Sequence, residues 1–203
     1  MLEKYTDLAL EAHELHGEDS GIELEEKEIN GIKVTHARVI SEEGARISGK
    51  APGIYINMDI GKVWLSDSKG FNQIAQTIAS QLFGLIPKEE GCVLVVGLGN
   101  IDITPDSLGP LTSKKLLVTR HIKRLDAELY QSAGFGCLAT IAAGVLGQTG
   151  METSEIIKSA VNAVKPKCVV LVDSLASRRL ARLGTTVQLS DSGISPGAGV
   201  LNK

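Results

Sequence analysis

Two short apolar runs constrain the fold of this chain more than any other feature. Cys92–Val96 and Cys168–Val172 contain only Cys, Val and Leu. Continuous runs of this kind are typical of parallel strands that helices cover on both faces. Segments with helical spacing lie at about 108–117 and 154–164, so strands and helices alternate along the second half of the chain. This alternation predicts an α/β fold with a doubly wound, mostly parallel central sheet.

The first half of the chain has a different pattern. The runs 22–29 and 32–40 alternate apolar and polar residues, and Asn30-Gly31 between them is a strong signal for a β-hairpin. The alternation predicts that one face of this hairpin is exposed to solvent. We expect further strands at 53–60 and 185–189 and a helix over 71–85. The N-terminal hairpin would pack beside the parallel sheet or form a small lobe.

Composition excludes several functional classes. The chain has 203 residues, a net charge of −3 and three cysteines. This charge gives no reason to expect nucleic acid as a partner. No segment reaches the ~18 consecutive apolar residues that a membrane span requires, so we expect no membrane partner and a cytoplasmic location. Cys92, Cys137 and Cys168 are widely spaced, which predicts reduced core thiols rather than a disulfide framework or a zinc site.

Two aspartates are the candidate catalytic residues. Asp106 follows the turn after the first run, and Asp173 directly follows the second. Because the carboxyl ends of parallel strands meet at one edge of a sheet, we expect both acids at that edge. Two carboxyl groups that approach each other cannot both ionise freely, so one pKa rises and the pair can activate water for attack on an amide. Each acid also has a structural interpretation: Asp106 as a helix N-cap and Asp173 as the cap of a turn. Asp102 is a third acid, either a metal ligand or an exposed residue.

Glycine-rich segments flank these acids. Gly97, Gly99 and Asn100 follow the first run and are expected to shape the floor of the site and to offer N–H donors. A dinucleotide fingerprint is excluded because Asp102 stands where that motif requires glycine. Near the C-terminus, Gly193 and Gly197 lie in a segment that is either a flexible tail or a loop that places N–H groups near an oxyanion.

Five segments together resemble the spore germination protease family. They are GLGNIDITPDSLGP at 97–110, LLVTRHI at 116–122, GQTGMETSEII at 147–157, VDSLASR at 172–178 and SDSGISPGAGVLNK at 190–203. The resemblance covers nearly the whole chain in the family's order. It implies an endopeptidase that starts the degradation of small acid-soluble spore proteins during germination, in the spore core of an endospore-forming bacterium. It also implies a three-layer phosphorylase/hydrolase-like sandwich, similar to hydrogenase maturation proteases, and a homotetramer.

The family's proposed catalytic acids match Asp106 and Asp173. Two alternatives stay open: a metal-assisted peptidase in which these acids are the metal ligands, and an inactive, shortened homologue that only binds. The favoured interpretation requires no cofactor. A chelator followed by metal add-back distinguishes the metal-assisted peptidase from the favoured interpretation. Binding of spore-protein segments without cleavage would identify the inactive homologue.

The resemblance also implies a zymogen that removes its own N-terminal segment. The family's substrates are cut after the first acid of a site similar to Glu-Ile-Ala-Ser-Glu, and Asp7-Leu8-Ala9-Leu10-Glu11 resembles it. We therefore expect self-cleavage between Asp7 and Leu8, with 1–7 as a propeptide and 8–203 as a single peptidase domain. Family members continue beyond the position that matches Lys203, so this chain is expected to be shortened at its C-terminus.

Overall fold

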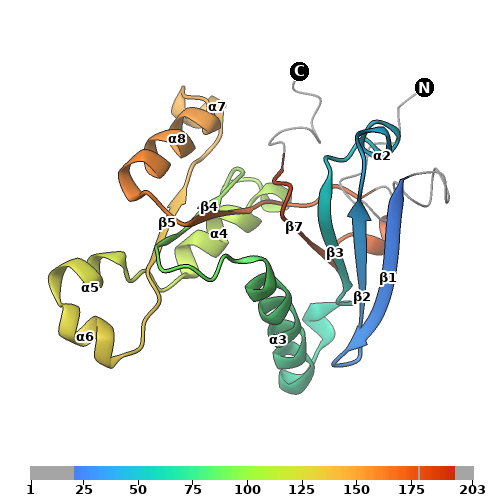
Figure 1. The fold of residues 1–203 in the computed structure, drawn as a ribbon, viewed down its shortest axis with the longest axis horizontal. Helices are drawn as coiled ribbons and strands as arrows, with labels where there is room; N and C mark the ends of the chain where they lie inside the picture. Colours follow the sequence, from blue (N-terminus) through green and yellow to red (C-terminus); the bar gives the residue numbers. More distant parts are fainter. Residues whose placement is uncertain (1–20, 178, 195–203) are drawn as a thin grey trace. The chain divides into compact units, whose positions relative to one another are not determined.

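A computed structural model describes residues 21–177 and 179–194, and its chain divides into two compact units (Figure 1). The hairpin unit comprises Met1–Ile86 and Leu175–Lys203, and the parallel-sheet unit comprises Pro87–Ser174. The single domain over 8–203 stays a prediction. Among the described residues, no helix is both long enough and apolar enough to cross a membrane.

The hairpin unit begins with the predicted β-hairpin. Strands β1 (Ile22–Ile29) and β2 (Ile32–Val39) are antiparallel, with Ile29 opposite Ile32. Asn30 and Gly31 have φ angles of 54° and 77°. A two-residue turn with both central φ angles positive matches the right-handed twist of the flanking strands, and Asn-Gly adopts it readily. The predicted hairpin and its turn are confirmed.

Two more strands extend this sheet. β3 (Gly53–Asp59) pairs with β2, and β7 (Thr186–Ser190) pairs with β3, which gives the antiparallel order β1-β2-β3-β7. The predicted strands at 53–60 and 185–189 therefore exist. The sequence did not predict that β7 returns to the hairpin's sheet from the far end of the chain.

Helices cover both faces of the central strand β2. Val34 lies in a core cluster with Ile74 of α3 (Ser68–Leu85), whereas Ala37 belongs to a second cluster that Ala45 of α2 (Glu42–Ser48) covers. Successive residues Val34 and Thr35 are only 0% and 2% exposed. The prediction of one solvent-exposed face is therefore wrong for β2, and residues 23–28 of the edge strand β1 are exposed on both faces. The described part of this unit also contains the short helices η2 (Val63–Leu65) and η4 (Leu180–Arg182).

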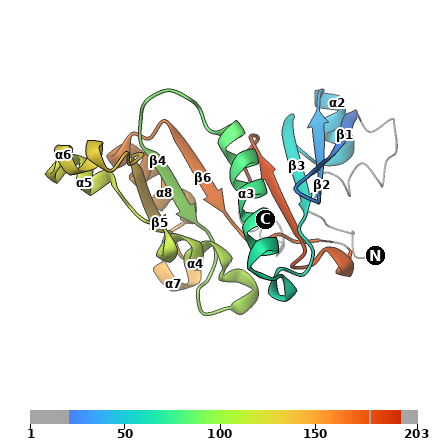
Figure 2. The same cartoon turned by 90° about the horizontal axis from the view of Figure 1, so that it is seen from below.

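The parallel-sheet unit contains the two apolar runs. β4 (Val93–Gly97) lies between β5 (Leu138–Ala142) and β6 (Cys168–Val172), and both pairings are parallel. The remaining elements are helices, and Figure 2 shows the chain leave the arrowhead of β4 and turn into α4. They are η3 (Thr104–Asp106), α4 (Leu108–Lys115), α5 (Arg120–Leu125), α6 (Ala127–Ser132), α7 (Leu146–Thr149) and α8 (Thr153–Val164).

Opposite faces of β4 carry different helices. Leu94 and Val96 are fully buried in a cluster with apolar residues of α8. Side chains alternate along a strand, so Gly97 faces the other way, where Gly109 of α4 lies against it. Helices thus cover both faces of this sheet, and the predicted helices at 108–117 and 154–164 are confirmed as α4 and α8. The chain is α/β, with a parallel three-stranded sheet and an antiparallel sheet that contains the N-terminal hairpin.

The cysteines lie at the amino end of the parallel sheet. All three are free thiols; Cys92 is buried, and Cys137 and Cys168 are half-buried. Burial, with a further contribution from the neighbouring Cys137, raises the pKa of Cys92 to about 12. Burial also raises the pKa of Cys168. The predicted core position is therefore confirmed for Cys92, whereas the reduced state of the three thiols stays a prediction.

Candidate active site

The carboxyl end of β4 packs directly against the start of α4. A Cβ added to Gly97 would meet the carbonyl oxygen of Gly109 and come within 2.5 Å of the Ser113 hydroxyl. Ser113 Oγ in turn donates a hydrogen bond of 3.1 Å to the carbonyl oxygen of Ile141 in β5. Only glycine at 97 and 109 permits this contact between strand end and helix, and the contact fixes the loop that joins them.

That loop holds the carboxylate of Asp106. The backbone N–H of Asn100 donates a hydrogen bond of 2.7 Å to Asp106 Oδ2. Gly99 has a φ of 105°, and a Cβ there would meet the Asp106 backbone oxygen and lie 2.7 Å from its Oδ1. The chain therefore wraps closely around this half-buried side chain. Because Ser107 is the N-cap of α4, the interpretation of Asp106 as the cap of that helix is wrong.

Asp173 follows β6 at the same edge of the sheet. Val172 lies opposite Gly97 in the parallel register, and the N–H of Leu98 donates a hydrogen bond of 2.9 Å to the Val172 carbonyl. Asp173 is half-buried, and its Oδ1 accepts a hydrogen bond of 2.8 Å from the N–H of Ser174. No turn is formed over the described residues 174–176, so the turn-capping interpretation is not confirmed beyond this one hydrogen bond to Ser174.

Gly109 lies against the carboxyl ends of both β4 and β6. A Cβ added to Gly109 would meet the carbonyl oxygens of both Leu98 and Val172. Asp106 is three residues before Gly109 and Asp173 is one residue after Val172, so both acids lie beside this junction. The expected placement at the carboxyl edge of the parallel sheet is observed. Such an edge is where α/β proteins commonly bind ligands.

The third strand of this sheet also contributes a side chain. Gln148, in α7 after β5, donates from Nε2 to Asn100 Oδ1 over 2.7 Å and to Asp102 Oδ2 over 3.0 Å. Asn100 Oδ1 accepts a second hydrogen bond of 2.9 Å from the N–H of Asp102. Sequence reasoning did not select Gln148. The signal was its place in a Gly-Gln-Thr-Gly segment after a strand, at the edge that carries Asp106 and Asp173.

Four other predicted site residues belong to the hairpin unit or lie outside the described residues. Gly193 belongs to the hairpin unit, where it has a φ of 78°. Gly197, Asp7 and Leu8 lie outside the described residues. The predictions of a glycine-rich oxyanion loop and of self-cleavage therefore stay predictions.

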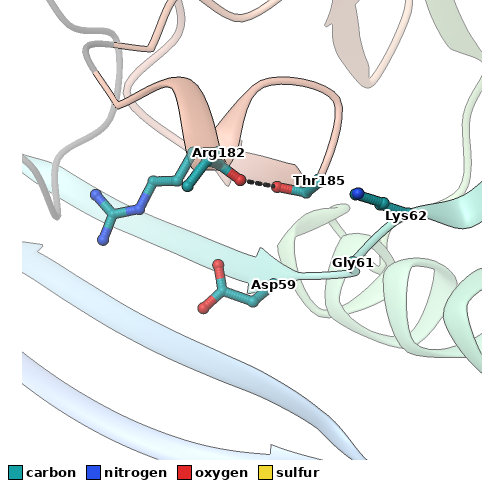
Figure 3. A pocket seen from close by; sticks show the side chains of 6 residues that line it. Asp59, Gly61, Lys62, Arg182 and Thr185 are labelled. Carbon is teal, nitrogen blue, oxygen red and sulfur yellow. Dashed lines mark hydrogen bonds between the residues drawn. The ribbon is translucent and has the colours of Figure 1, made fainter.

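A shallow pocket of about 370 Å³ lies elsewhere, in the hairpin unit (Figure 3). It combines one acidic side chain with two basic ones, and Thr185 Oγ1 donates a hydrogen bond of 2.8 Å across its wall to the Ala181 carbonyl. The lining residues are Asp59, Gly61, Lys62, Ala181, Arg182 and Thr185. None of the predicted site residues is among them.

A metal has few candidate ligands at the acid pair. Over residues 21–177 and 179–194, no group of three or more His, Cys, Asp or Glu side chains could hold a metal ion together. Asp106 Oδ2 and Asp173 Oδ1 each already accept a backbone N–H.

Known proteins match this chain along nearly its full length. The family model described as germination protease matches residues 3–203. This chain belongs to the germination protease family. A germination protease of Clostridium acetobutylicum is 43% identical over 206 residues, covering 97% of this chain and 63% of the relative. Those of Geobacillus sp. strain WCH70 and Caldanaerobacter subterraneus subsp. tengcongensis are 42% and 43% identical, with 57% and 62% of the relatives covered.

The chain thus spans about three fifths of the length of these relatives. The match to the germination protease family includes both candidate acids, their loops and the Gly-Gln-Thr-Gly segment. The structural edge described above therefore falls entirely within the matched region.

Proposed function

We propose that this chain is an endopeptidase of the germination protease type and that Asp106 and Asp173 are its catalytic acids. The observation that supports the proposal is the parallel register of β4 and β6, because the chain segments that carry Asp106 and Asp173 follow these two strands at the same carboxyl edge of the sheet. Membership of a protease family supports a hydrolytic role for this pair.

The proposed chemistry is water activation by a carboxyl pair. One ionised carboxylate accepts a proton from water as the water oxygen attacks the peptide carbonyl carbon. The other carboxyl group, protonated, donates its proton to the leaving amide nitrogen as the carbon–nitrogen bond breaks. The N–H groups of Leu98 and Asn100 already donate to Val172 and Asp106, so we propose the N–H of Gly99 as the oxyanion donor of this loop. The proposed reaction uses no metal; retention of activity in a chelator is the corresponding test.

The substrates and setting follow from the resemblance to the family. We propose that the chain cleaves small acid-soluble spore proteins in the spore core and assembles as a homotetramer. We also propose that it is made as a zymogen cut between Asp7 and Leu8. An intact mass that stays unchanged in a sample that cleaves substrate would contradict self-processing.

We further propose that the chain adopts the family's three-layer phosphorylase/hydrolase-like sandwich. The position of α4 and α8 on opposite faces of the parallel sheet supports this arrangement.

The proposed function is tested with a peptide containing Thr-Glu-Ile-Ala-Ser-Glu, followed by mass spectrometry from mildly acidic to neutral pH. We expect cleavage after the first Glu, with a loss of at least about 100-fold in Asp106→Asn and in Asp173→Asn. Asp126→Asn is the matched control, since that exposed aspartate caps α6 by accepting the N–H of Leu129. Full activity in either site variant would refute the assignment of that acid.

A further inference from the structure

The segment after β5 is a structured loop with one side chain directed at the candidate acids' loop. Thr149 Oγ1 donates to the carbonyl oxygen of Val145 or of Met151, at 3.2 and 3.0 Å, and accepts the N–H of Met151 at 3.1 Å. Gly150 ends α7 in the left-handed region with a φ of 68°. Because β5 is the parallel neighbour of β4, this loop emerges at the edge that carries Asp106.

Gln148 leaves this loop and reaches the one after β4. Its Nε2 has two N–H donors and meets two acceptors, Asn100 Oδ1 at 2.7 Å and Asp102 Oδ2 at 3.0 Å. This pairing fixes which end of the Gln148 amide faces the loop, since the oxygen end would place acceptor against acceptor.

Asn100 links Gln148 to Asp106. Its side-chain oxygen is held by Gln148 and by the N–H of Asp102, while its backbone N–H donates to Asp106 Oδ2 at 2.7 Å. Because these hydrogen bonds hold the side chain of Asn100, they also restrict rotation of its backbone. The backbone N–H of Asn100 therefore keeps its direction toward the Asp106 carboxylate. Two sets of hydrogen bonds that meet at Asn100 thus connect Gln148 of α7 with the candidate acid Asp106.

We propose that Gln148 is a positioning residue that holds the Asp106 carboxylate in its reactive orientation through Asn100. Its effect on catalysis rests on the proposed peptidase function. Each of the three parallel strands then supplies one part of the site: Asp106 after β4, Gln148 after β5 and Asp173 after β6. Small displacements of a reacting group lower rates steeply, so loosening these hydrogen bonds should reduce kcat without weakening substrate binding.

The test compares Gln148→Ala and Gln148→Glu with the wild-type chain. Gln131→Ala is the matched control, because Gln131 is an exposed glutamine on α6 of the same unit. We expect kcat to fall about tenfold in both Gln148 variants, as for the loss of one or two partly exposed hydrogen bonds. KM should change less than about twofold and the unfolding midpoint should stay unchanged. Hydrogen exchange of the Asn100 amide, followed by NMR, should become at least about fivefold faster.

A double-mutant cycle separates positioning from a general structural role. If Gln148 acts through the Asn100 side chain, Gln148→Ala should cost less than about twofold in an Asn100→Ala background. Full additivity, an unchanged Asn100 exchange rate, or an unchanged kcat in Gln148→Ala would each overturn the proposal.

Failure of the proposed function has a different signature. A wild-type chain that cleaves nothing, or an Asp106→Asn variant that cleaves normally, would reject the peptidase assignment. In that case the exchange rate of the Asn100 amide still decides whether Gln148 holds Asn100: faster exchange in Gln148→Ala supports the positioning contact, and an unchanged rate overturns it.

Discussion

The backbone N–H of Asn100 donates a hydrogen bond of 2.7 Å to the carboxylate of Asp106, six residues further along the chain. This bond closes the loop between β4 and α4 around the candidate acid. It also depends on Gly99, whose missing side chain leaves room for Asp106. The conformation of the loop therefore depends on its contacts with the Asp106 carboxylate.

Substitution of Gly99 should disrupt this loop. Gly99 has a φ of 105°, and a Cβ would meet the Asp106 backbone oxygen, so Gly99→Ala combines backbone strain with a steric clash. We expect the free energy of unfolding to fall by about 2–4 kcal/mol, measured by urea denaturation. Gly84→Ala in α3 is the control, because a Cβ there meets no atom within 4 Å and alanine favours a helix. Equal stability of both variants would contradict the close contact at Gly99.

The two acids should act as one unit. If Asp106 and Asp173 serve the same proton transfers, removing the second after the first should cost little more. We expect the kcat/KM of the Asp106→Asn/Asp173→Asn double variant to lie within about fivefold of that of the less active single variant. Single-turnover cleavage assays give the rates. If the loss of kcat/KM in the double variant equals the product of the losses in the two single variants, the acids contribute independently.

Cys92 should be unreactive in the folded protein. Thiolate is the nucleophile, and burial raises the pKa of Cys92 to about 12, so almost no thiolate is present at pH 8. We expect alkylation by iodoacetamide to be at least about 100-fold slower in the native chain than in urea. Peptide mapping by mass spectrometry separates Cys92 from the half-buried Cys137 and Cys168. Modification of native Cys92 at the unfolded rate would contradict its burial.

The buried side-chain amide of Asn57 lowers the stability of the fold. This residue of β3 is 2% exposed, and within the described part of the chain neither Nδ2 nor Oδ1 has a hydrogen-bond partner. Unsatisfied buried amides are costly, so Asn57→Leu, which has a similar shape, should raise the free energy of unfolding by about 1–3 kcal/mol.

Chemical denaturation of Asn57→Leu beside an exposed control, Asn72→Leu on α3, tests this expectation. A loss of stability in Asn57→Leu alone would mean that the amide has a partner in solution.

Local sequence determined much of this protein. The Val- and Leu-rich runs predict β4 and β6 because such residues favour strands buried on both faces. Asn30-Gly31 predicts the hairpin because both residues tolerate positive φ angles. Apolar spacing predicts α3 and α8, and the position of Asp106 and Asp173 after their strands predicts the edge at which they lie. Each of these signals acts within a few residues of the chain.

Only the tertiary structure decided which strands pair, which helices cover them and which side chains bond to each other. β7 pairs with β3 although more than a hundred residues separate them, and β2 is covered on both faces because α2 and α3 approach from opposite sides. Asp106 accepts the N–H of Asn100 rather than capping α4, and Gln148 reaches Asn100 from another strand's loop. Such pairings depend on which distant surfaces meet when the core forms, whereas periodicity and propensity record only whether a segment is a strand, a helix or a turn.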